Sequence, residues 1–319
     1  MKVLSLFDGI SCARVALDKA GIPVDKYFAS EIDKYAISIS QKNYPDIIQI
    51  GDVKDISSVG AKIDLLIGGS PCQDLSIAKK NRQGLDGARS GLFWEYVRIL
   101  NEVKPKYFVL ENVASMPKEA KQIITEALGV EPIMINAALV SAQNRKRLFW
   151  TNIPNVTLSE DRNILLKDIL EKDVDEKYNV NLSAKYDKTK LEKESVGFNP
   201  FSGTLLNKKA RALNTGCGSA TTKNATTIRV GSIGQGGQGD RIYSPEGKSV
   251  NLSALGGGRG AKTGLYLDNS QIRKLTPVEC ERLQSLPDNY TEGVSNTQRY
   301  KALGNGFNVE VISHILKYL

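Results

Sequence analysis

One cysteine, Cys72, stands where a thiol could act as a nucleophile. It ends the run Gly68-Gly69-Ser70-Pro71-Cys72, which follows an apolar stretch typical of a buried strand. Proline stiffens such a turn and glycines allow a ligand to approach closely, so the thiol would lie at the mouth of a sheet. The alternative is a buried structural cysteine, the usual role of an isolated one.

The single histidine, His314, limits the chemistry open to Cys72. It excludes a Ser-His-Asp triad in the main body of the chain and argues against Cys–His catalysis. A reactive Cys72 would therefore need arginine or backbone dipoles to stabilise its thiolate. The four cysteines, which are Cys12, Cys72, Cys217 and Cys280, form no Cys-x-x-Cys pair, so no metal site is expected.

Two arginines could supply that positive charge. Arg145 and Arg147 precede an apolar stretch, and alternation along an extended chain places Gln143 on the same side. Three polar side chains on one face of a strand call for a partner. A solvated basic edge is the alternative, and the spacing alone does not distinguish the two.

A carboxyl group, Glu111, follows the apolar stretch at 107–110. A carboxyl at the edge of a sheet and away from bulk water can hold a proton and serve as an acid. An ordinary loop carboxylate is the alternative interpretation.

Three further acidic residues follow strand-like stretches. Asp8-Gly9-Ile10 could form a turn that cradles a nucleotide, although it lacks the full GxGxxG pattern. Glu31 suits a pair of ribose hydroxyls, and Asp52 could accept from an adenine amino group. Together they predict a cofactor that contains adenosine.

All these residues depend on a scaffold that gathers strand ends. Strands are expected at residues 3–7, 27–30, 47–50, 63–67, 107–110, 133–136 and 148–151, and helices at 11–20, 33–42 and around 93–103. This alternation predicts an α/β fold, in which a parallel sheet is covered by helices on both faces. Ligands bind such sheets beyond the carboxyl ends of the strands, where the polar residues above would collect.

The second half of the chain has a different composition. Residues 161–177 predict a charged amphipathic helix, whereas 197–264 contain 15 of the 28 glycines and predict short strands and long loops. Helical character returns at Thr276-Pro277 with Glu279, a capping-box pattern, and in a last helix from about 308.

Positive charge is concentrated in this half. Residues 185–274 carry 15 Lys or Arg against 6 Asp or Glu, a net charge of +9, while the whole chain carries +8. A concentrated basic segment indicates a polyanionic partner such as nucleic acid. A merely soluble basic surface is the alternative.

The motifs and their order resemble those of C5-cytosine DNA methyltransferases of the bacterial or phage type. The matching motifs are Phe7-Asp8-Gly9-Ile10-Ser11, Glu31, Gly51-Asp52-Val53, Pro71-Cys72-Gln73, Ser90-Gly91-Leu92-Phe93, Glu111-Asn112-Val113, Gln143-x-Arg145-x-Arg147, residues 273–287 and Gly304-Asn305. The glycine-rich basic insertion lies where that family carries its target-recognition domain. The resemblance therefore implies a Rossmann-like methyltransferase sheet with a smaller, mostly β or irregular target-recognition domain.

The resemblance also implies S-adenosyl-L-methionine as methyl donor and a cytosine flipped out of the duplex as acceptor. Cys72 would add to C6 of the base, and Glu111 would hydrogen-bond ring N3. Arg147 would bind O2, with Arg145 nearby favouring the thiolate and the phosphate. The residues that it implies for cofactor binding are Phe7, Asp8, Gly9, Ile10, Glu31, Asp52, Val53, Pro71, Leu92 and Asn305.

Three departures from the family pattern bear on the cofactor pocket. Ser11-Cys12 stands where a glycine pair is frequent, and Asp74-Leu75 where phenylalanine is common. In the tenth motif, Gly306-Phe307 replaces the usual Ser or Ala followed by Val.

By the same resemblance, we expect a catalytic and cofactor domain at 1–155, a target-recognition region at 156–271 and a return to the catalytic domain at 272–319. The expected partner is duplex DNA, and the expected protein is a cytoplasmic monomer with no membrane span. Such an enzyme acts either beside a cognate restriction endonuclease or as an orphan.

Three other functions compete with this interpretation. An RNA-directed member of the family could use the same chemistry, but the large basic insertion favours duplex DNA. A catalytically silent DNA-binding regulator would not need the complete set of Cys72, Glu111 and Arg147. A nucleotide-binding oxidoreductase would explain the α/β half and leave Cys72 and the insertion without a role.

Overall fold

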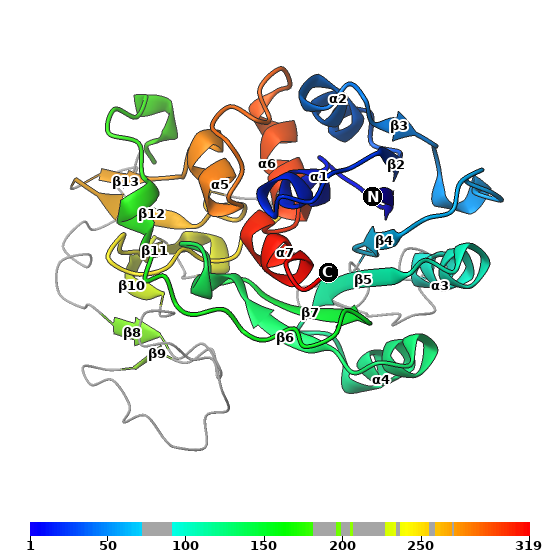
Figure 1. Ribbon diagram of the computed structural model, residues 1–319. Helices are drawn as coiled ribbons and strands as arrows, with labels where there is room; N and C mark the ends of the chain where they lie inside the picture. The colour runs from blue at the N-terminus through cyan, green and yellow to red at the C-terminus, as the bar shows by residue number, and fades with distance from the viewer. Residues whose placement is uncertain are drawn as a thin grey trace. The chain divides into compact units, whose positions relative to one another are not determined.

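The computed structural model describes residues 1–71, 91–180, 196–198, 205–206, 227–233, 237–254, 259–269 and 271–319, and it contains two compact units (Figure 1). The first unit comprises Met1–Ile135, Lys146–Leu158 and Gly306–Leu319, and the second Asn136–Arg145 and Ser159–Asn305. Within these described ranges, no helix is both long and apolar enough to cross a membrane. Cys72 and Cys217 lie outside the described residues.

A seven-stranded sheet in the order β3-β2-β1-β4-β5-β7-β6 forms the centre of the first unit. Its strands are β1 (Lys2–Leu6), β2 (Lys26–Ser30), β3 (Ile48–Gln49), β4 (Leu65–Gly68), β5 (Tyr107–Val113), β6 (Ile133–Asn136) and β7 (Lys146–Thr151). Strands β1 to β5 pair in parallel, which confirms the expected α/β class.

The expected parallel pairing does not extend to β7, which runs antiparallel to β5. Only the short segment 137–145, with one 3-10 turn, η3 (Ala137–Leu139), leads from β6 to β7. That segment is too short for the crossover connection that two parallel strands require. Strand β5 is also longer than expected, so Glu111 lies inside it rather than after it.

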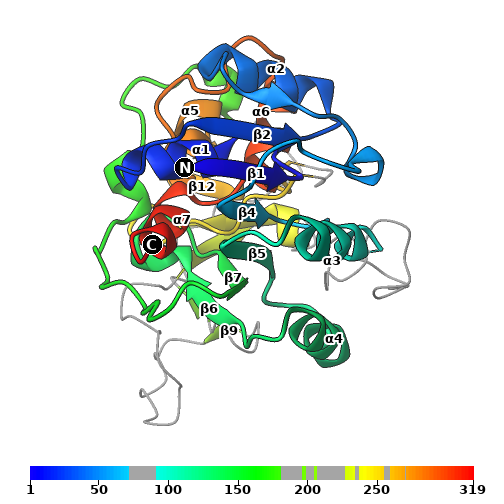
Figure 2. The ribbon, with the colours of Figure 1, turned by 45° about the vertical axis from the view of Figure 1, so that its right-hand side comes forward.

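Helices cover the sheet. Figures 1 and 2 draw α1 (Cys12–Lys19) beside α7 (Val309–Leu316), and α3 (Leu92–Val103) with α4 (Lys118–Leu128) apart from them. Helices α3 and α4 contribute Tyr96 and Ile124 to a core shared with Leu6 and Leu110 of the sheet. Helix α2 (Lys34–Asn43) begins at Asp33, whose side chain accepts from the backbone N–H of Tyr35, as the sequence predicted.

The second unit contains a six-stranded sheet in the order β13-β12-β11-β10-β8-β9. Its strands are β8 (Val196–Phe198), β9 (Leu205–Leu206), β10 (Ile228–Ser232), β11 (Arg241–Tyr243), β12 (Leu265–Asp268) and β13 (Gln271–Arg273), and its helices are α5 (Pro277–Leu283) and α6 (Asn296–Asn305). The short strands agree with the glycine-rich composition. The expected domain boundaries at 155 and 271 stay a prediction.

The amphipathic helix expected at 161–177 is wrong. Only the 3-10 turns η4 (Leu166–Ile169) and η5 (Glu176–Tyr178) occur there. The backbone N–H groups of Leu166 and Lys167 donate to the carbonyl oxygens of Gly247 and Pro245 at 2.9 and 3.0 Å. Partners distant in the sequence therefore take the donors that a helix would need.

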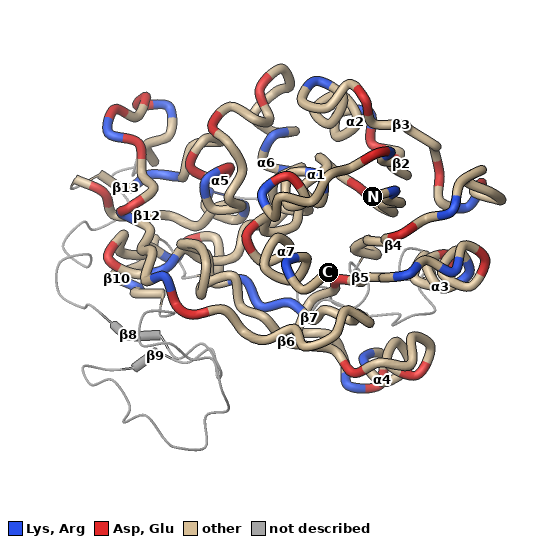
Figure 3. The backbone as a smooth tube through the Cα atoms, viewed as in Figure 1, with Lys and Arg blue, Asp and Glu red and all other residues tan. Residues whose placement is uncertain are grey.

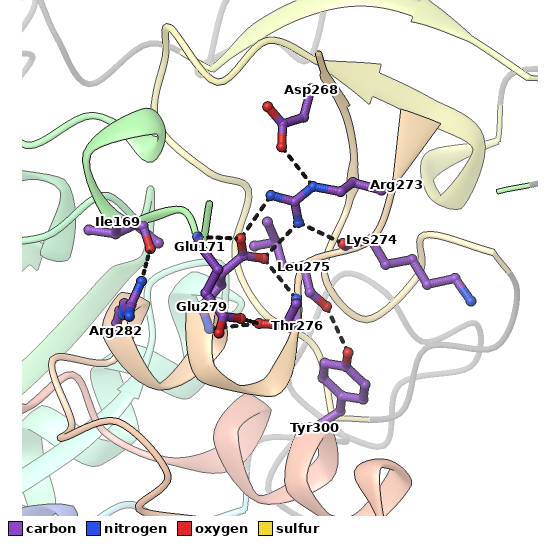
Figure 4. A network of polar contacts seen from close by, with 10 residues as sticks. All are labelled: Ile169, Glu171, Asp268, Arg273, Lys274, Leu275, Thr276, Glu279, Arg282 and Tyr300. Atoms are coloured by element: carbon purple, nitrogen blue, oxygen red, sulfur yellow. Dashed lines mark hydrogen bonds and ion pairs between the residues drawn. The ribbon is translucent and has the colours of Figure 1, made fainter. Parts of the chain in front are cut away.

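A buried ion pair joins β13 to α5, and the 161–177 segment contacts its carboxylate (Figure 4). The guanidinium of Arg273 contacts both carboxylate oxygens of Glu279 at 2.8 Å, and these side chains are 3% and 0% exposed. Glu279 also caps the helix with Thr276, which confirms the predicted capping box, and its Oε1 accepts from the N–H of Glu171 at 3.0 Å. The β12–β13 hairpin, the 161–177 segment and α5 thus meet at one carboxylate.

Acidic and basic residues are interspersed along the described parts of the chain, as Figure 3 shows. Eight of the 15 Lys and Arg between 185 and 274 lie outside the described residues. The polyanionic partner therefore stays a prediction from the sequence.

Candidate active site

The turn after β1 is shaped by three residues with positive φ. Phe7, Gly9 and Ser11 have φ values of 56°, 62° and 57°. Glycine adopts this conformation freely, whereas serine needs compensation. Ser11 obtains it from its hydroxyl, which donates to the carboxylate of Asp8 and shares a hydrogen bond with the hydroxyl of Ser40. The departure from a glycine pair is thus accommodated by side-chain bonds.

Asp8 itself is buried. Its second carboxylate oxygen accepts from the hydroxyl of Tyr27 at 2.6 Å, so the side chain fixes the turn from behind. Burial raises the pKa of Asp8 above its ordinary value of 3.8. The side chains of Ile10 and Val53 are also buried, so any contact that they make with a ligand would come from the backbone.

Glu31 joins the ends of β1 and β2. Its Oε2 accepts from the N–H of Gly9, and its Oε1 accepts from the N–H groups of Ile32 and Asp33, each at 2.8 Å. These bonds fix the carboxylate, whose remaining lone pairs can accept from a pair of vicinal hydroxyls. Ile32 was missed by the sequence analysis, although it is 72% exposed directly beside Glu31. An exposed apolar residue that follows a strand-end acid is the signal that could have found it.

Asp52 lies three residues after β3 and caps the 3-10 turn η1 (Val53–Asp55). Its Oδ1 accepts from the N–H of Lys54 at 3.1 Å. Since a carboxylate has a second acceptor oxygen, Asp52 can also receive an amino group. Phe7, Gly9, Glu31 and Asp52 therefore all lie at strand ends of the first unit, as the alternation predicted.

Two aromatic rings enclose the glycine pair at the end of β4, of which Gly68 is the last residue of the strand and Gly69 follows it. A β-carbon at Gly68 would lie 3.2 Å from the ring of Tyr96, and one at Gly69 would lie 2.7 Å from the ring of Phe307. Successive residues of an extended chain point to opposite faces, so the rings approach from the two sides. Because the glycines have no side chains, the two rings can pack against their backbone. Ser70, Pro71 and Cys72 follow directly in the sequence.

The turn before Cys72 is also held by β5. Asn112 is buried and its side-chain amide donates to Oγ of Ser70 at 3.2 Å. The sequence predicted no separate role for Asn112 or for Ser70. Cys72 lies outside the described residues, whereas Pro71 is the last described residue before it.

Glu111 and Arg147 form an ion pair on neighbouring strands. Val113 is the register partner of Arg147, so Arg147 is diagonal to Glu111 on the same face of the sheet. The Nε of Arg147 lies 2.7 Å from Oε1 of Glu111, and both side chains are 13% exposed. The pair presents one carboxylate oxygen, which can accept from an amino group or share a proton with a ring nitrogen, beside guanidinium N–H groups that can donate to a carbonyl oxygen.

Arg145 has a different environment. It is 3% exposed, and its guanidinium donates to Oδ1 of Asn251 at 2.8 Å and to the carbonyl oxygen of Gly304 at 3.3 Å. These three residues belong to the second unit, where Arg145 fastens two distant segments. Gln143 is fully buried there, although alternation predicted one shared face with Arg147.

Two more candidates, Leu92 and Asn305, belong to different units. Leu92 is the first residue of α3 and packs against the core of the first unit. Asn305 is exposed at the last position of α6 in the second unit. Among the described residues, no cluster of His, Cys, Asp or Glu could hold a metal ion.

Comparison with known proteins adds a family and a fold. Residues 1–319 match the family model C-5 cytosine-specific DNA methylase. The chain is 30% identical to the type II methyltransferase M.HhaI of Haemophilus parahaemolyticus over 337 residues, which cover 99% of this chain and 93% of the relative. It is 28% identical to the orphan methyltransferase M.SPRI of Bacillus phage SPR, covering 100% and 97%.

Solved structures support the same fold. The Entamoeba histolytica methyltransferase EhMeth superposes with a TM-score of 0.69 at 16% identity, over 100% of this chain and 97% of that one. A putative DNA modification methyltransferase encoded within an Escherichia coli prophage gives 0.63 at 20% identity, over 100% and 98%.

Proposed function

The chain belongs to the C-5 cytosine-specific DNA methylase family, and we propose that it methylates C5 of a cytosine flipped out of duplex DNA through a covalent bond from Cys72 to C6. The observation that carries this proposal is the ion pair between Glu111 and Arg147, which lies at 2.7 Å on the strands beside the turn that leads to Cys72.

S-adenosyl-L-methionine fits the residues at the ends of β1, β2 and β3. The anchored carboxylate of Glu31 would bind the ribose hydroxyls, and Asp52 would accept from the adenine amino group. Phe7 and the exposed Ile32 would supply apolar surface for the adenine ring. When bound, this cofactor supplies a methyl group on a positively charged sulfur. Leu92, Pro71 and Asn305 stay proposed contacts.

The protein must make C5 of cytosine nucleophilic, since that carbon reacts poorly in the free base. The Cys72 thiolate would add to C6 and push electron density onto the ring. Oε2 of Glu111, the oxygen not contacted by Nε of Arg147, would carry a proton and donate to N3, while Arg147 would donate to O2. Donors placed where negative charge develops stabilise the transition state. After C5 has gained the methyl group, loss of the C5 proton to a base such as a water molecule would release Cys72.

The target-recognition role falls to residues 156–271, whose basic segment would contact phosphates and read bases in the major groove. As with the two relatives named above, one a type II enzyme and one an orphan, the protein would act either beside a restriction endonuclease or alone. We propose that it works as a monomer in the cytoplasm.

Methyl transfer from radiolabelled S-adenosyl-L-methionine to duplex DNA and to transfer RNA tests the proposed substrate. The wild-type protein is expected to label DNA only, and Cys72→Ser is expected to label neither while still binding S-adenosyl-L-homocysteine. Labelling of RNA alone would contradict the proposal and support an RNA-directed enzyme. Equal labelling by wild type and Cys72→Ser would exclude Cys72 as nucleophile.

A further inference from the structure

The ring of Phe307 closes the space above Gly69. A β-carbon at Gly69 would lie 2.7 Å from Cε1 and 3.2 Å from Cζ of this ring. Side chains do not approach so closely, so the contact requires glycine at position 69. Phe307 is only 8% exposed, and its ring is therefore held by packing.

The position that a β-carbon of Gly69 would occupy also faces the carboxylate of Glu111. The hypothetical β-carbon would lie 3.2 Å from Oε2 of Glu111, and Arg147 holds the other carboxylate oxygen at 2.7 Å. The ring of Phe307 and the carboxylate of Glu111 thus meet at the backbone of Gly69, which lies three residues before Cys72 in the sequence. All the groups described here belong to the first unit.

The sheet order puts this convergence between the two proposed ligands. Strand β4, which leads to Gly69, lies between β1 and β5. The turn after β1 would hold the cofactor, and β5 carries Glu111, which would hold the base. Neighbouring strands are about 4.8 Å apart, so a group passing from one ligand to the other must cross the end of β4.

We infer that Phe307 limits the size of the group that the methyl donor can carry, because its ring occupies the space over Gly69. The inference rests on the proposed function. A sulfonium that bears a methyl group fits beside the ring, whereas one that bears an allyl group meets it. Phe307 is thus a specificity residue for the donor.

Calorimetric titration without DNA tests this inference. S-adenosyl-L-homocysteine, S-adenosyl-L-methionine and its S-allyl analogue are titrated into wild type, Phe307→Ala and Phe93→Leu. Wild type is expected to bind the allyl analogue about tenfold more weakly than the methyl compound, in line with the effect of extra carbons in a tight pocket. Phe307→Ala should reduce this ratio below about threefold. Phe93 is another buried aromatic residue of the same unit, so Phe93→Leu should keep the wild-type ratio.

The outcomes separate the inference from the function on which it rests. An unchanged ratio in Phe307→Ala that still binds S-adenosyl-L-homocysteine overturns the inference and leaves the methyltransferase proposal intact. If Phe307→Ala loses that binding, Phe307→Leu is titrated instead. The ratio between binding of the methyl and allyl compounds is then expected to fall in Phe307→Leu. An unchanged ratio would overturn the inference. A folded wild-type protein that binds none of the three ligands contradicts the proposed function itself.

Discussion

The side-chain nitrogen of Asn112 donates to both the hydroxyl and the carbonyl oxygen of Ser70, at 3.2 and 3.4 Å. Asn112 is 1% exposed and adjoins Glu111 in β5, while Ser70 precedes Pro71 and Cys72. Strand β5, which supplies the proposed acid, therefore also holds Ser70, two residues before the proposed nucleophile in the sequence.

Replacement of Asn112 by alanine tests this linkage. Without the amide, the turn before Cys72 loses its anchor, and a misplacement of about 1 Å can lower a rate by about 100-fold. Asn112→Ala should lower kcat by about that factor and leave S-adenosyl-L-homocysteine binding within about threefold of wild type. Ser70→Ala keeps the carbonyl acceptor and should lose less. Wild-type kcat in Asn112→Ala would show that the turn holds itself.

Arg147→Lys separates charge from geometry. In arginine, Nε can contact Glu111 while the terminal nitrogens face the base. Lysine keeps the positive charge, but its single ammonium group does not offer these separate donors. The kcat for DNA methylation should fall by about 100-fold or more, as when a transition-state donor is removed. Cofactor binding, measured by titration with S-adenosyl-L-homocysteine, should not change. A lysine variant with normal kcat would contradict the role given to the guanidinium.

Arg145→Met should act on stability. The substitution leaves Oδ1 of Asn251 and the carbonyl oxygen of Gly304 without this donor in a buried place. The free energy of unfolding should fall by about 1–3 kcal/mol in urea titrations. The control is Lys121→Met, an exposed residue of α4, with an expected change of at most about 0.5 kcal/mol. Equal stability of the two variants would refute the structural role of Arg145.

Asp8 should make stability depend on pH. Its pKa is raised by burial, so the folded protein binds the proton more tightly than the unfolded chain does. The resulting stabilisation of the folded protein is complete at pH values below the ordinary pKa of 3.8. It is lost as the pH rises through the raised pKa. As the pH rises from the ordinary value of 3.8 through the raised pKa, the free energy of unfolding of wild type should therefore fall relative to that of Asp8→Asn. Parallel pH profiles for the two proteins would show that Asp8 titrates normally.

The buried pair of Arg273 and Glu279 should be essential to the second unit. Glu279→Gln leaves a buried guanidinium without its carboxylate and should cost about 3–5 kcal/mol in the free energy of unfolding. Asp268 pairs with the same arginine but is 20% exposed, so Asp268→Asn should cost about 1 kcal/mol or less. Urea titrations compare the two. Equal losses would mean that burial does not decide the strength of these pairs.

Local signals in the sequence were enough for several elements. The start of α5 followed from Thr276, Pro277 and Glu279, and that of α2 from Asp33, because each cap is a bond between near neighbours. The strand ends that carry Glu31 and Asp52 followed from alternation of apolar and polar stretches. These features depend on residues only a few positions apart.

Features that depend on distant partners were not predictable. The 161–177 segment has helical periodicity, but its donors bind Gly247 and Pro245 instead. The antiparallel course of β7 depends on how the chain returns from β6, and the contact of Phe307 with Gly69 joins residues far apart in sequence. Helix α4 went unnoticed, although Ala120, Ile124 and Leu128 recur at helical spacing.

The most direct test of the account is to read every cytosine of an unmethylated plasmid by bisulfite sequencing after incubation with S-adenosyl-L-methionine and either the wild-type protein or Cys72→Ala. We predict protected cytosines within one short sequence motif for the wild type and none for the variant. A folded wild-type protein that binds the cofactor and protects no cytosine would contradict DNA cytosine methylation. Protection that persists in Cys72→Ala would contradict the covalent mechanism.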